Sequence, residues 1–98
     1  MNIYKKEILK DFVRKHAIAM NAVQNWVFTV SNAQWKSFNE LKLAFPTADY
    51  VGNNRVVFNI KGNNFRIVAV VIYLANSMEI RWIGTHAEYD KILDCSLL

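Results

Sequence analysis

Four side chains in the last third of the chain have the chemistry to bind an anion and to move a proton. They are two arginines, a histidine and a tyrosine, namely Arg66, Arg81, His86 and Tyr89. Guanidinium groups bind phosphates through a planar fork of donors, and an imidazole exchanges protons near neutral pH. Between Asp49 and Glu79 the chain has no acidic residue. This combination suits the binding of a phosphodiester and, with the proton-transfer groups, its cleavage.

Each of these residues also has an ordinary structural role. Arg66 would be paired with a distant acid, extend to the sheet edge, or face a ligand phosphate. The ordinary role of Arg81 is a cross-strand salt bridge. His86 and Tyr89 are three residues apart, so they can share one face of a helical turn, or His86 is simply exposed and Tyr89 packs in the core. The residues alone leave these alternatives open.

The N-terminal half of the chain has helical periodicity. Apolar positions at helical spacing predict helices over residues 5–16 and 17–30, after a short strand over residues 2–4. A capping box from Ser37 to Glu40 begins a third helix, which Pro46 ends.

The C-terminal half predicts a sheet. Turn residues separate three strands over residues 55–60, 65–74 and 78–83, with Trp82 on the core face beside Ile80. Thr85 to Glu88 forms a second capping box and opens a short helix, whose predicted packing positions are Tyr89, Ile92 and Leu93. The order of elements predicts an α+β two-layer domain, with N-terminal helices packed on a small antiparallel sheet and a short C-terminal helix.

Composition limits the class of protein. The chain has 98 residues, 53% of them hydrophobic, with no repeat or linker, so we predict a single domain over residues 1–98. There is no secretory signal and no long apolar run, so we expect a cytoplasmic protein that does not span a membrane. Cys95 is the only cysteine, and two histidines seventy residues apart lack ligand spacing, so we expect no metal and no cofactor.

Two segments resemble the HigB-type toxins of type II toxin–antitoxin systems, within the RelE-like mRNA interferases. One runs from Asn59 to Arg66, with an N-x-F/Y-R motif at its end, and the other runs from Ile80 to Ile92 through Gly-Thr-His-x-Glu-Tyr-Asp. The segment Trp35–Glu40, ahead of the Phe45-Pro46 break, is also similar to that family.

This resemblance implies a RelE-like fold and an endoribonuclease that cleaves translated mRNA at the ribosome without a metal. It also implies neutralisation by a HigA-type helix-turn-helix antitoxin. In such an enzyme Arg66 and Arg81 would stabilise the phosphate, His86 would act as general base or acid, and Tyr89 would transfer or position a proton. The expected RNA-binding residues are Lys61, Arg55, Asn64 and Phe65, with Phe65 or Trp82 stacking on an unpaired base.

Two other functions are compatible with the same sequence. The first is a non-catalytic RNA-binding module whose cationic sheet holds phosphates. The second resembles the ParE-like toxins, which share the architecture and act on DNA gyrase. A gyrase poison has no need of a proton-transfer pair, so His86 and Tyr89 favour the nuclease.

Overall fold

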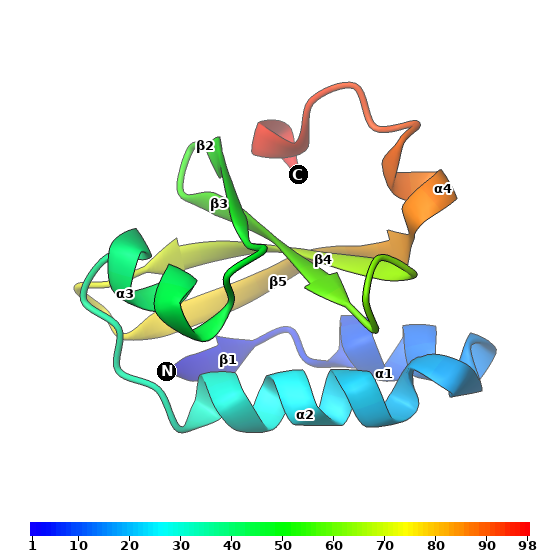
Figure 1. The fold of residues 1–98 in the computed structure, drawn as a ribbon, viewed down its shortest axis with the longest axis horizontal. Coiled ribbons are helices and arrows are strands. Elements are labelled where there is room, and N and C mark those ends of the chain that lie inside the picture. Colours follow the sequence, from blue (N-terminus) through cyan, green and yellow to red (C-terminus); the bar gives the residue numbers. More distant parts are fainter.

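A five-stranded sheet with helices across one face forms the framework of the protein (Figure 1). The computed structural model describes residues 1–98. The predicted α+β class is confirmed. The strands are β1 (Asn2–Tyr4), β2 (Asp49–Gly52), β3 (Arg55–Ile60), β4 (Phe65–Ile72) and β5 (Ser77–Thr85), and the α-helices are α1 (Glu7–Lys15), α2 (Met20–Ser31), α3 (Phe38–Ala44) and α4 (His86–Tyr89). Single 3₁₀ turns lie at Ala17–Ala19 and Cys95–Leu97.

The strand order is β1-β5-β4-β3-β2. Strands β3, β4 and β5 are antiparallel neighbours, as predicted, and β2 adds to them antiparallel to β3, whereas β1 lies parallel to β5 at the edge. No hairpin joins β1 to β5, so nothing local in the sequence indicated this direction. Strand β2 was also not predicted, because only its turn has a clear signal. That turn, Asn53-Asn54, has φ of 50° and 63°, the backbone of a tight hairpin.

The core lies between the sheet and the two long helices. Helices α1 and α2 present one apolar stripe each to the sheet, as their periodicity predicted. Trp26 of α2 is buried and meets Phe58 of β3 edge-on, with 5.2 Å between ring centroids. Each large side chain buried in this way contributes roughly 1.5–3 kcal/mol. None of the helices combines the length and the apolar character needed to cross a membrane.

A bulge in β5 changes which side chains face the core. Val68 pairs with Trp82, but Ala69 pairs with Ile80, so Arg81 is an extra residue in the ladder. Because strand side chains alternate, one extra residue moves the following ones to the other face. Ile83 therefore packs in the core and Trp82 lies on the opposite face, so the prediction that Trp82 faces the core is wrong.

The C-terminal segment crosses the sheet face that the long helices leave open. In Figure 1, α4 and the chain end lie on the side of the sheet away from α1 and α2. The capping box at the start of α4 is confirmed: the Thr85 hydroxyl accepts from the Glu88 amide, and the Glu88 carboxylate accepts from the Thr85 amide. The helix ends after one turn, so Leu93 is fully exposed and its predicted packing role is wrong.

Candidate functional site

Arg66 lies on the open face of the sheet, on the central strand. Its neighbours across the ladder are Asn59 of β3 and Gly84 of β5. The guanidinium carbon is 4.6 Å from the centre of the Tyr89 ring, within cation–π distance. The Nε atom is buried without a hydrogen-bond partner. Arg66 therefore has a stacked, oriented guanidinium group with donor capacity to spare.

Three acidic side chains in the last third of the chain contact groups other than Arg66. Glu79 pairs with Arg81, and Glu88 caps α4. Asp90 lies 3.1 Å from the Nδ1 atom of His86. Of the alternatives for Arg66, the ion pair with a distant acid is absent from the structure, so its positive charge remains available to an anion.

Tyr89 lies between Arg66 and Trp82. The indole and phenol ring centroids are 6.1 Å apart, with the planes tilted by 55°. The indole lies above Gly84, where a Cβ atom would come within 2.5 Å of the indole Cη2 atom. Burial, followed by its interaction with the Cys95 side chain, raises the pKa of Tyr89 to about 12. The phenol is therefore protonated at neutral pH and is no general base there.

His86 and Asp90 form a polar pair at the start of α4. Their side chains are four residues apart and meet on one helical face. The imidazole is 44% exposed, and the His86 main-chain amide donates to the Asn64 carbonyl oxygen at 3.1 Å. A carboxylate at Nδ1 favours the tautomer that carries its proton there, which leaves Nε2 free to accept a proton. The pair has the form of an oriented general base.

Arg81 and Arg55 lie apart from this cluster and hold the chain end. The Leu98 main-chain oxygen accepts from Nε of Arg81 at 2.9 Å, and from Nε and NH2 of Arg55 at 3.0 and 2.7 Å. Arg81 also pairs with Glu79 at 2.5 Å, two residues earlier on the same strand. The salt bridge expected for Arg81 is therefore present, but it does not cross between strands. Arg81 is three positions before Gly84, the ladder partner of Arg66, so the two arginines are offset by about 10 Å along the sheet.

The turn between β3 and β4 supplies the remaining predicted residues. Lys61 and Asn64 are exposed there. The Asn64 carbonyl oxygen accepts from the His86 amide, whereas Lys61 lines a hollow beside α2 together with Asn25 and Thr29. Phe65 instead packs in the core, 5% exposed and edge-on to Phe12. Its ring offers no face to a base, whereas the half-buried Trp82 does lie on the open face. No group of three His, Cys, Asp or Glu side chains is placed to hold a metal ion.

The structure thus places Arg66 on Tyr89, in the helical turn that also carries His86, and adds Asp90, which was not proposed for the site. Trp82, which was proposed to stack on a base but was expected on the core face, joins the site through its contact with Tyr89. Asp90 had a detectable signal, since it lies four residues after His86 on a predicted helix. The place of Trp82 on the open face had no such signal, because it depends on the bulge. We refer to Arg66, Trp82, His86, Tyr89 and Asp90 as the α4 cluster.

The sequence matches one protein family over residues 19–92, a range that contains the whole α4 cluster. That family is described as the HigB toxin, the RelE-like toxic component of a toxin–antitoxin system. The chain belongs to the HigB family. HigB proteins from two bacteria are similar over most of its length.

In Escherichia coli K12, the "mRNA interferase toxin HigB" is 33% identical over 96 residues, covering 92% of this chain and 88% of that protein. The "mRNA interferase HigB" of Shigella flexneri has the same identity and coverage. A further "mRNA interferase HigB", from Escherichia coli O6:H1, is 27% identical over 94 residues, covering 94% and 91%. A HigB-family toxin implies an antitoxin partner.

Proposed function

We propose that this HigB-family chain is an mRNA interferase, an endoribonuclease that cuts translated mRNA in the cytoplasm at the ribosome and so arrests growth. Its cognate inhibitor is a HigA-type helix-turn-helix antitoxin. Similar proteins that carry the name mRNA interferase support this proposal. The structural observation that carries it is the stacking of Arg66 on Tyr89, in the same helical turn as the His86–Asp90 pair.

The proposed reaction uses the ribose 2′-hydroxyl as nucleophile and needs no metal. His86 takes the 2′-hydroxyl proton on Nε2 while Asp90 holds the ring through Nδ1. The 2′-oxygen attacks the adjacent phosphorus, and the bond from phosphorus to the 5′-oxygen breaks. The products are a 2′,3′-cyclic phosphate and a 5′-hydroxyl end, which takes up one proton. Arg66 stabilises the charge that gathers on the phosphorane oxygens.

Tyr89 acts in this scheme as a positioning group and hydrogen-bond donor. With its pKa at about 12 it keeps its proton at neutral pH, so it is not the base that activates the 2′-hydroxyl. Its ring fixes the Arg66 guanidinium at 4.6 Å. The sequence left open whether His86 or Tyr89 is the general base. In this scheme His86 is the general base.

Further cations extend the site along the RNA backbone. Lys61 and Asn64, in the exposed β3–β4 turn, contact the RNA backbone next to the scissile phosphate. Arg55 and Arg81 lie farther along the same face and now bind a main-chain oxygen. We propose that they bind RNA phosphates after the C-terminal segment is displaced. Trp82 supplies the ring on which an unpaired base stacks.

Substrate chemistry tests the proposal most sharply. A reporter mRNA with a single 2′-deoxynucleotide on the 5′ side of the scissile phosphate is predicted to remain intact under conditions where the all-ribose mRNA is cut. Cleavage of the deoxy substrate at the same site would exclude 2′-hydroxyl attack.

A matched protein variant tests the role of His86. We expect His86→Gln to lose growth arrest and RNA cleavage while it keeps its circular-dichroism spectrum and melting temperature. Full toxicity of this folded variant would remove His86 from the mechanism. RNA binding without cleavage by the wild-type chain, even with ribosomes, would leave a non-catalytic RNA-binding module as the function.

A further inference from the structure

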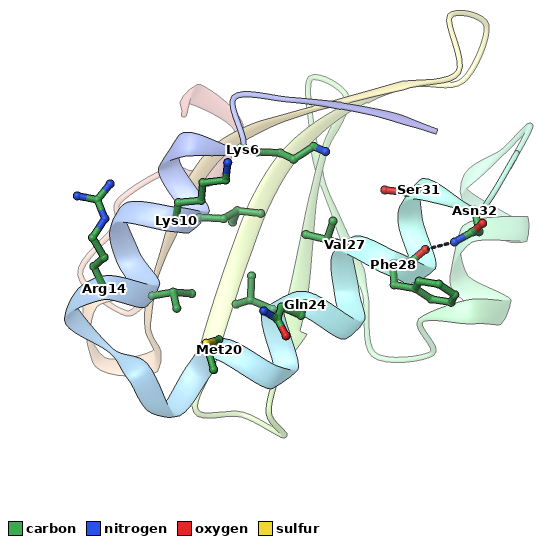
Figure 2. A pocket seen from close by; sticks show the side chains of 12 residues that line it. Lys6, Lys10, Arg14, Met20, Gln24, Val27, Phe28, Ser31 and Asn32 are labelled. Carbon is green, nitrogen blue, oxygen red and sulfur yellow. Dashed lines mark hydrogen bonds between the residues drawn. The ribbon is translucent and has the colours of Figure 1, made fainter.

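A long groove runs between α1 and α2 on the outer side of the helical layer, away from the α4 cluster (Figure 2). Its volume is about 740 Å³. Side chains from α2 line it along the whole helix, at the spacing of one helical face: Met20, Val23, Gln24, Val27, Phe28 and Ser31. Twelve residues of helix extend about 18 Å, so the groove has the length of three helical turns.

The groove has an apolar base and further apolar side chains that are exposed to solvent. Leu9 and Val23 are buried at its base, whereas Phe28 is 70% exposed and Met20 is 45% exposed. Exposed aromatic and methionine side chains grouped on one surface are typical of protein-binding sites, because they bury a large area on contact and adapt to the partner. Scattered apolar residues would need no such account, but these line one continuous groove.

The charged side chains of the groove have one sign. Lys10 and Arg14 of α1, and Lys6 just before it, lie along one side, as Figure 2 shows, and no acidic residue lines the groove. Arg14 is paired with Asp11 at 2.6 Å, but Lys6 and Lys10 have no side-chain partner. The opposite side carries the uncharged Gln24, Ser31 and Asn32.

We propose that this groove binds an amphipathic helix of the antitoxin, with apolar residues at i, i+3, i+4 and i+7 and with acidic residues along the edge that meets Lys6 and Lys10. A helix laid between two helices matches the shape and length of the groove. A second copy of this chain fits it poorly, because a two-fold contact would bring the lysines of both copies together. The inference rests on the proposed function only for the identity of the partner.

Such docking has a consequence for inhibition. The groove and the α4 cluster lie on opposite faces of the sheet, so a helix bound in the groove leaves Arg66 and His86 uncovered. The groove is then an attachment site, and substitutions in it should weaken antitoxin binding without any loss of RNA cleavage.

The test uses the purified full-length chain, its purified cognate antitoxin and calorimetric titration. The groove variants are Phe28→Ser and Lys10→Glu. Their matched controls are Leu74→Ser, a fully exposed leucine in the β4–β5 turn, and Lys36→Glu, an exposed lysine before α3. We expect each groove variant to weaken antitoxin binding by about 30-fold, the effect of losing an interface hot spot, and each control by less than about threefold. Lys10→Glu should also make association less sensitive to salt.

Several outcomes would overturn the inference. One is a groove variant that binds the antitoxin as tightly as its control. Another is a wild-type chain that is a dimer by itself and that Phe28→Ser converts to a monomer, because a second copy would then fill the groove. RNA cleavage, measured without antitoxin in the same preparations, separates this inference from the proposed function. A wild-type chain that never cuts RNA contradicts the nuclease and leaves the binding comparison intact.

Discussion

Gly84→Ala should disturb the α4 cluster through a single methyl group. Gly84 faces Arg66 across the ladder and lies under the Trp82 indole. A Cβ atom there would approach the indole Cη2 atom to 2.5 Å and the Glu88 carboxylate to 3.0 Å. Ordinary carbon contacts are about 3.5–4.0 Å, so the indole must move by roughly 1 Å or more.

The expected cost follows from overpacking. Inserting a methyl group into a packed site typically costs about 1–3 kcal/mol of unfolding free energy, and Trp82 is only half-buried, so we expect about 2 kcal/mol. The displaced indole pushes on Tyr89 and so on the Arg66 guanidinium, and RNA cleavage should fall as well. The predicted loss of cleavage is tenfold or more, because small misplacements of catalytic groups have large effects on rate.

A double-mutant cycle isolates the clash. Phenylalanine lacks the atoms of the indole that the new methyl group would meet, so in a Trp82→Phe background Gly84→Ala should cost less than about 0.5 kcal/mol. Urea unfolding of the four proteins measures the coupling directly. An equal cost of Gly84→Ala in both backgrounds would refute the account of Trp82 lying over Gly84.

Three smaller predictions concern the same end of the sheet. Asp90→Asn should slow RNA cleavage at least about tenfold and leave the urea midpoint almost unchanged, because its pair with His86 is exposed; an unchanged rate would show that the carboxylate does not orient the ring. The pKa of Tyr89 is raised to about 12, so the folded state holds this proton more tightly than the unfolded state, and the stability this adds is complete below pH 10 and is lost as the pH approaches 12. The ultraviolet titration of phenolate should therefore differ between wild type and Tyr89→Phe only near pH 12, and a difference centred at pH 10 would contradict the burial of this phenol. Thr85→Val removes the N-cap hydroxyl of α4 and should lower the free energy of unfolding by about 1 kcal/mol in urea, whereas an unchanged value would mean that this cap contributes nothing.

Local signals in the sequence predicted most of the elements around the site. The Thr85–Glu88 capping box placed the start of α4 correctly, because both of its hydrogen bonds are formed within four residues. The turn over residues 61–64 placed the hairpin between β3 and β4 for the same reason, with Lys61 and Gly62 at positive φ. These features depend only on neighbouring residues.

Features that depend on distant residues were not predictable. The bulge at Arg81 arises where β5 pairs with β4, and it moved Trp82 from the expected core to the open face. Arg55 and Leu98 are 43 residues apart, and nothing in the sequence near Arg55 indicates that contact. The sequence named Arg66 and Tyr89 as site residues but did not predict that they stack on each other. Their relative position follows from the β4–β5 register.

Single-turnover cleavage of a translated mRNA by Arg66→Ala tests the central claim most directly, with Arg14→Ala as the matched control. Arg14 is an exposed arginine on the other face of the molecule, so its removal should leave the rate within about twofold of wild type. Loss of the Arg66 guanidinium should lower the rate by about 100-fold or more, the usual effect of removing one charge-stabilising donor. A folded Arg66→Ala protein that cuts as fast as Arg14→Ala would contradict the assignment of the α4 cluster as the catalytic site.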